Sequence, residues 1–156
     1  MLGRVRNILS SLQTYADLGP DLAVRHQVNQ WLNQRTSLTA EQWFQTYWQP
    51  LDVSSSVANF AYTHLSNYSG LDFSRVCPTD RLIEDLKFPL VCWFDWQMAL
   101  CDDFWECFGI DLSEQLDSET LPTIQDLVLD LNRFSEIADG DAEAESNQDS
   151  QPDRSS

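Results

Sequence analysis

Residues 90–108 have the sequence LVCWFDWQMALCDDFWECF, and the periodicity of this stretch indicates the fold class. Its apolar and acidic residues recur at helical spacing, and Gly109 follows at a position that commonly ends a helix. The sequence therefore predicts one helix over residues 90–108. On a helical wheel its apolar arc spans about 220°, roughly twice the minimum width of a core-facing stripe. The core of a small helical domain cannot bury so wide an arc, so another part of the chain or a partner protein must cover the remainder.

This helix is also the candidate docking surface, because tryptophans lie at the edges of its apolar arc and acids form a stripe beside it. The candidate partner-binding residues are Trp93, Asp95, Trp96, Asp102, Asp103, Trp105 and Glu106. Exposed tryptophan clusters mark protein interfaces, and opposite charge steers the encounter of two proteins. Two other interpretations stay open: N-terminal tryptophans could bury the edges within the chain, and the acids could form an ordinary solvated face.

The other periodic segments also show helical spacing rather than the alternation of a half-buried strand. Thr39 and Ser54 are positioned to cap helices, and Thr123 with Asp126 resembles a capping box. The predicted helices cover residues 5–12, 24–32, 39–48, 54–70 and 123–134, with a long loop over 71–88 and a short turn over 112–116. The predicted fold class is therefore all-α.

Charge and composition divide the chain into three parts. Residues 1–50 form a predicted N-terminal helical extension, and residues 51–135 form the main helical domain. Residues 136–156 contain seven acids against one base and almost no apolar side chains. Such a composition cannot bury enough apolar surface to fold, so a disordered acidic C-terminal tail is expected there.

The overall charge excludes some classes of function. The 156 residues contain 25 Asp and Glu against nine Lys and Arg, a net charge of −16. Such a surface repels phosphate backbones, so a nucleic-acid partner is not expected. The longest apolar run, residues 88–94, is far shorter than the roughly 20 residues of a membrane span, so no membrane insertion is expected. Without a signal-peptide core or a C-x-x-C pair, the sequence favours the reducing cytoplasm.

Five motifs follow one another in order between residues 57 and 134. They are YSGLDF at 68–73, PTDRLIEDL at 78–86, MAL at 98–100, FGIDL at 108–112 and LPTIQDL at 121–127. This order resembles the acyl carrier protein family, whose chain runs from a helix and long loop through an EDL motif, a recognition helix and an FGI motif to a last helix. The resemblance implies an acyl-carrier-like helical bundle over about half of the chain.

The resemblance also implies a missing attachment site. Carrier proteins attach phosphopantetheine to a serine at the start of the recognition helix. That position holds Leu90 when the motifs are aligned from EDL, and Phe94 when they are aligned from FGI. No serine lies between Ser74 and Ser113, and a side chain without a hydroxyl cannot form the phosphopantetheinyl ester. The chain therefore resembles a degenerate member that keeps the fold without the cofactor.

The remaining side chains indicate no catalytic or metal chemistry. His26 and His64 lie in no recognised motif, and the sequence has no triad pattern, phosphate loop or metal-ligand spacing. We therefore expect no enzyme, no cofactor and no metal. The predicted function is a non-enzymatic interaction or adaptor module whose partner has a basic or apolar docking surface. Two alternatives stay open: an acyl or peptidyl carrier modified at a non-standard site, and an acidic inhibitor or immunity-type protein.

Overall fold

The computed structural model describes the backbone of residues 19–116 and 121–146, and side chains up to residue 140 within those ranges. Helices joined by loops make up these residues, with one isolated bridge between Arg81 and Thr123 and no strand among them. The described part of the chain is all-α, as predicted. The helix expected over residues 5–12 lies outside the described residues.

The first described helices begin at the capping residues that the sequence provides. Helix α2 (Leu22–Leu32) is capped by Asp21, whose carboxylate accepts the backbone N–H groups of its first turn. Helix α3 (Ala40–Trp43) begins at a capping box between Thr39 and Gln42, as the position of Thr39 predicted. It continues through a π-helical turn, η1 (Phe44–Trp48), and a short 3-10 turn, η2 (Gln49–Leu51).

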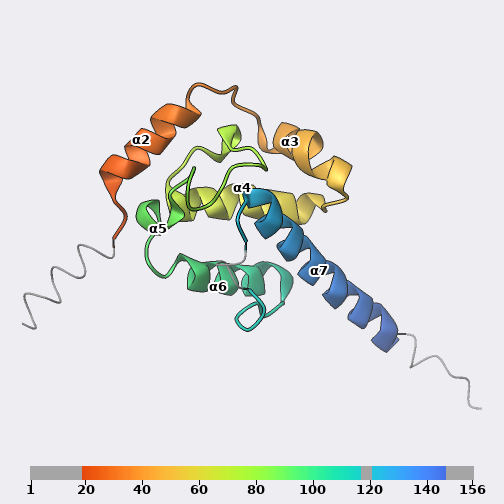
Figure 1. The fold of residues 1–156 in the computed structure, drawn as a ribbon. Helices are drawn as coiled ribbons and strands as arrows, with labels where there is room; N and C mark the ends of the chain where they lie inside the picture. Colours follow the sequence, from red (N-terminus) through yellow and green to blue (C-terminus); the bar gives the residue numbers. More distant parts are fainter. Residues whose placement is uncertain (1–18, 117–120, 147–156) are drawn as a thin grey trace, which may run out of the picture.

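Helix α4 (Ser55–Ser69) lies at the centre of the fold (Figure 1). Ser54 caps its start, and Gly70 ends it with a left-handed φ of 64°, so both predicted boundaries are confirmed. Helices α3, α6 and α7 all contact α4. The loop that follows contains one 3-10 turn, η3 (Phe73–Arg75).

The prediction of one helix over residues 90–108 is wrong. The structure has a short helix α5 (Phe88–Val91) and a separate helix α6 (Trp96–Phe108). The backbone carbonyl of Leu90 accepts the Asp21 N–H at 2.8 Å, and that of Val91 accepts Arg25 Nη2 at 2.7 Å. A continuous helix would use both carbonyls for its own bonds four residues on. Helix α2 therefore stabilises the break at residues 92–95.

The last helix, α7 (Ile124–Ser146), is longer than predicted. Its start is confirmed: Thr123 and Asp126 exchange backbone-to-side-chain hydrogen bonds of 3.1 and 3.2 Å. The prediction of a disordered tail from residue 136 is wrong for residues 136–146, which continue the helix (Figure 1). Alanine and glutamate alternate over residues 142–145, and both have high helix propensity. Residues 147–156 of the predicted tail lie outside the described residues.

One hydrophobic core joins the N-terminal residues to the remainder of the fold. Trp43 and Trp48 are fully buried, and the Trp43 ring lies 5.3 Å from that of Tyr62 in α4. The Trp43 indole N–H donates to the Val76 carbonyl at 2.8 Å. These aromatic side chains therefore fill the space between α3 and α4 instead of covering α6.

Candidate docking surface

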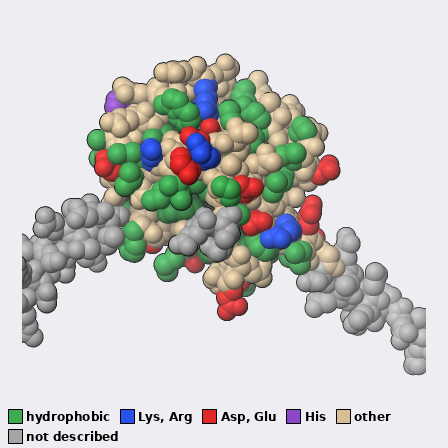
Figure 2. All heavy atoms as spheres, in the orientation of Figure 1, with side chains coloured by type: hydrophobic (Ala, Val, Ile, Leu, Met, Phe, Trp, Pro, Cys, Tyr) green, Lys and Arg blue, Asp and Glu red, His purple; other side chains and the backbone are tan. Residues whose placement is uncertain are grey.

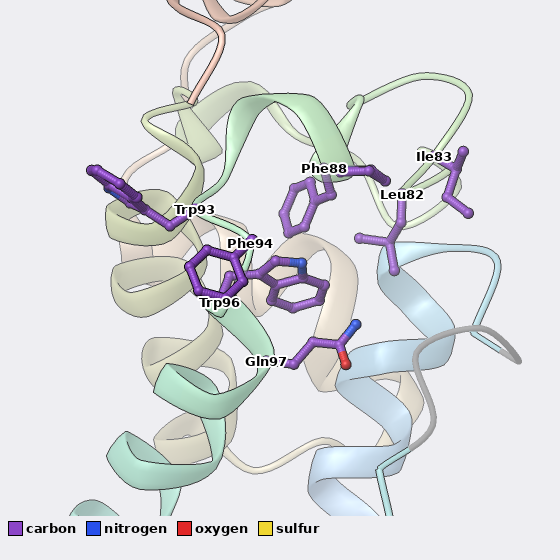
Figure 3. Close-up of a pocket in the computed structure, with 8 residues that line it drawn as sticks. Leu82, Ile83, Phe88, Trp93, Phe94, Trp96 and Gln97 are labelled. Carbon is purple, nitrogen blue, oxygen red and sulfur yellow. The ribbon is translucent and has the colours of Figure 1, made fainter. Parts of the chain in front are cut away.

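An apolar groove of about 380 Å³ lies where the loop over residues 81–86 meets α5 and the start of α6. It is lined by Leu82, Ile83, Phe88, Pro89, Trp93, Phe94, Trp96 and Gln97. Figure 3 shows Phe88 and Trp96 between the Trp93–Phe94 pair and the Leu82–Ile83 pair. The Phe88 and Trp96 rings meet edge to face, with centroids 5.2 Å apart.

The break between α5 and α6 determines which aromatic side chains are exposed. Trp93 and Phe94 lie in the break and are 53% and 63% exposed. Trp96, at the start of α6, is only 8% exposed because it packs on Phe88. Of the predicted tryptophans, Trp93 therefore presents its side chain for contact, whereas Trp96 is part of the floor of the groove.

A second exposed strip runs along the outer face of α6. Trp96, Leu100 and Phe104 point into the core at four-residue spacing, which leaves Met98 and Trp105 exposed on the other side. Met98 also lines a hollow of about 220 Å³ beside the turn at residues 113–115. The polar side chain of Gln97 lines both this hollow and the groove, so the two hollows are neighbours. In Figure 2, hydrophobic side chains are exposed between charged ones on the face that is drawn.

Three of the four predicted acids are available for contact. Asp95, Asp102 and Glu106 are exposed, and no hydrogen bond or ion pair joins their side chains to any other described residue. Opposite charge on a partner could therefore pair with them at little cost in existing contacts.

Asp103 instead binds α4. Its Oδ2 atom lies 3.2 Å from Nδ1 of His64 and accepts the Tyr68 hydroxyl at 2.5 Å. Burial, with the Asp103 carboxylate beside it, raises the pKa of Tyr68 well above its usual range, so this hydroxyl stays a donor. Asp103 thus connects α6 to α4 and is not free for a partner.

His64 lies in a position that fits a structural role. Its ring stacks on Phe60 with centroids 4.3 Å apart, and it shares a shallow hollow with Cys107. No hydrogen bond joins Cys107 to His64 in the part of the chain that the structure describes, so the two do not form a nucleophile–base pair there. Nor does any group of three His, Cys, Asp or Glu side chains converge on a metal-sized site within these residues.

The sequence predicted one side of the groove and missed the other. Its helical pattern indicated the residues from Trp93 to Glu106, but gave no signal for Leu82 and Ile83, which lie in an irregular loop. That loop is held by backbone bonds from Leu82 to the Pro122 carbonyl and from Phe88 to the Leu82 carbonyl, at 3.0 and 2.9 Å. The first bond joins segments that are distant in sequence, and neither bond leaves a periodic trace in the sequence.

Comparisons with known proteins add no relative. No protein-family model, curated protein or solved structure matches this chain. The likeness to acyl carrier proteins therefore depends on the order of its motifs alone and stays a prediction. No helix among residues 19–116 and 121–146 is long and apolar enough to cross a bilayer.

Proposed function

We propose that this chain is a non-enzymatic interaction or adaptor module that docks a partner protein on α5 and α6. The observation that carries this proposal is the exposure of five large apolar side chains within sixteen residues, each at least half exposed: Leu90, Trp93, Phe94, Met98 and Trp105. Contiguous exposed apolar surface costs free energy in water unless a partner covers it. Tryptophan in particular is enriched among residues that dominate binding energy.

The charge around this surface specifies the chemistry of the partner. Asp95, Asp102 and Glu106 lie along it, and the whole chain has a net charge of −16. A basic segment with apolar anchors would pair its Lys or Arg side chains with these acids while its anchors enter the groove. We therefore expect an amphipathic, basic partner surface.

A carrier-like fold for this module is part of the same proposal. The order of α4, a long loop, α6, the turn at 113–115 and α7 supports it, because carrier proteins share that order of elements. Both positions that align with the attachment serine, Leu90 and Phe94, bear exposed apolar side chains. The intact mass of the native protein tests this point, since a covalent phosphopantetheine would contradict a non-carrier role.

A cytoplasmic location fits the same function. Cys77, Cys92, Cys101 and Cys107 are all unpaired thiols, and disulfides are rare in reducing compartments. The proposal therefore includes a partner in the cytoplasm.

Site-specific photo-crosslinking in the native cells tests the docking surface. A benzophenone amino acid replaces Phe94 in the groove, and a control chain has it in place of Leu51, which is also exposed but lies in η2. We expect one protein to crosslink through position 94 only, at a peptide with Lys or Arg beside apolar residues. Trp93→Ala in the same chain should reduce the yield several-fold. Equal yields from both positions, or no crosslink at position 94, would contradict the proposal.

A further inference from the structure

The groove lies next to the point where the first described residues meet α5. The Asp21 N–H donates to the Leu90 carbonyl at 2.8 Å, and Arg25 donates to the Val91 carbonyl at 2.7 Å. Pro89, the neighbour of Leu90, lines the groove. In Figure 1 the start of α2 lies beside α5. The described chain thus begins two residues before Asp21, which contacts α5 next to the groove.

The sequence of residues 1–18 is complementary to this groove. Its aliphatic side chains recur at i, i+3, i+4 and i+7, at Val5, Ile8, Leu9 and Leu12. Residues 1–16 contain Arg4 and Arg6 and no acid, whereas the chain as a whole has 25 acids against nine bases. The segment thus has the basic, amphipathic chemistry that the groove selects.

The charges beside the groove favour a basic occupant. Two exposed acids, Glu84 and Asp95, are adjacent in sequence to residues that line it. Arg81 lies 4.0 Å from Glu84 and 3.6 Å from Asp85, so it already has carboxylate partners. Arg25 already donates to the Val91 carbonyl, and Lys87 is a further base nearby. A second copy of the chain would add another net charge of −16 to this face, which disfavours self-association.

The connecting residues are long enough. Six residues, 13–18, separate Leu12 from the described chain, and an extended segment of that length spans up to about 20 Å. The eight residues from Val5 to Leu12 would extend about 12 Å as a helix. A connection of this length also gives an effective concentration in the millimolar range, so weak affinity is enough for intramolecular occupancy.

We propose that residues 1–18 dock back into the groove, with the aliphatic stripe against Phe94, Trp96 and Ile83. Arg4 and Arg6 then face the acids at its rim. This inference deepens the proposed function, because a segment that occupies the groove competes with a partner for it. A partner must therefore bind the groove tightly enough to displace residues 1–18. Its test needs no partner, so the two proposals can fail separately.

The test compares the full chain with a full-length Ile8→Asp/Leu9→Asp variant by NMR. We expect the indole N–H signals of Trp93 and Trp96 to shift between the two chains, while that of the buried Trp43 stays in place. A peptide with the sequence of residues 1–18 is then added to the variant chain. It should return both signals towards their wild-type positions, with a dissociation constant of about 0.1 to 1 mM. The wild-type chain, whose groove is already occupied under this proposal, should bind the peptide about two- to tenfold more weakly.

Matched substitutions locate the binding site. Ile83→Asp in the groove should abolish the response to the peptide, whereas Ile137→Asp on α7 should leave it unchanged; the two isoleucines are 58% and 56% exposed. Indole signals that do not respond to Ile8→Asp/Leu9→Asp would overturn the inference. So would signals that shift with protein concentration as a dimer forms, because a second copy would then be the occupant. A Phe94 crosslink to a partner combined with either of these results would leave the proposed function intact.

Discussion

Asp80 is a buried carboxylate that joins the loop over residues 77–80 to Arg35, which follows α2. It accepts both Arg35 guanidinium N–H groups, at 2.6 and 2.9 Å, and the Cys77 backbone N–H at 2.7 Å. We predict that Asp80→Asn lowers the free energy of unfolding by about 2 to 3 kcal/mol, because the charged hydrogen bonds are lost and Arg35 is left partly buried. Urea unfolding measures this change.

The control for Asp80 is a carboxylate in a solvated ion pair. Asp130 pairs with Arg133 at 3.1 Å on the surface of α7, where the Arg133 side chain is 62% exposed. Asp130→Asn should therefore cost less than about 0.5 kcal/mol. A similar loss in both variants would contradict the structural role assigned to Asp80.

The buried Cys92 thiol should make the free energy of unfolding depend on pH in the alkaline range. Burial raises the pKa of the Cys92 thiol to about 12, whereas an unfolded cysteine titrates near 8.5. The unfolded state then loses its proton first, so the free energy of unfolding falls as pH rises from about 9 towards 12, by up to about 1.4 kcal/mol per pH unit. Urea unfolding across this range should show a shallower decline for Cys92→Ala, which lacks the thiol. Parallel declines would assign the effect to other groups.

Tyr47 contributes to the same decline at higher pH. Its hydroxyl lies 3.5 Å from the Cys77 sulfur, and this hydrogen bond, together with burial, raises the pKa of Tyr47 to about 12. An unfolded tyrosine titrates near 10, so its contribution begins about 1.5 pH units above that of Cys92. The comparison between wild type and Cys92→Ala cancels this shared contribution.

Two glycines end helices in the left-handed conformation and differ in what surrounds them. Gly109 has a φ of 68° and open space where a Cβ would lie, so Gly109→Ala should cost only the backbone strain, about 1 kcal/mol. A Cβ on Gly70 would lie 2.6 Å from the Arg25 side chain, whose guanidinium holds the Val91 carbonyl. Gly70→Ala should therefore cost more, about 2 kcal/mol, in urea unfolding.

Gly140 lies within α7, so its substitution by alanine is the matched control for the substitutions at Gly70 and Gly109. It has no left-handed φ, and no atom lies within 4 Å of an added Cβ. Gly140→Ala should increase the far-ultraviolet helical signal and stabilise the end of α7 by about 0.5 to 1 kcal/mol locally. A destabilising Gly140→Ala would show that this part of α7 is not helical in solution.

Helix boundaries were predictable where the signal is local. The hydrogen bonds of Thr39 with Gln42 and of Thr123 with Asp126 span three residues, so the sequence contained both partners in one short motif. The break between α5 and α6 was not predictable in this way. The contact between Arg25 and Val91 that stabilises it joins residues 66 positions apart. Periodicity alone therefore merged two helices into one.

The same error explains which part of the candidate site was predicted. A single helix over residues 90–108 places Trp96 and Trp105 on opposite edges of one apolar arc. With the break, Trp96 packs on Phe88 while Trp105 stays exposed. The sequence correctly indicated that residues 90–108 have more apolar side chains than the core covers, because that excess depends on amino-acid composition alone. The identity of the exposed residues depends on tertiary contacts that the sequence pattern does not contain.

The net charge of −16 affects the stability of the whole molecule. Repulsion among carboxylates opposes the compact state, and added salt screens it over about 10 Å or less. We predict that sodium chloride raises the free energy of unfolding, by on the order of 1 kcal/mol between low and high salt. Urea, which is uncharged, is the denaturant that measures this effect without adding ions. At a pH near the carboxylate pKa values, about 4, the gain should shrink because fewer charges remain. If salt instead destabilises the protein, attractive pairs such as Arg35–Asp80 outweigh the repulsion, and the acidic surface contributes little to the energy of the fold.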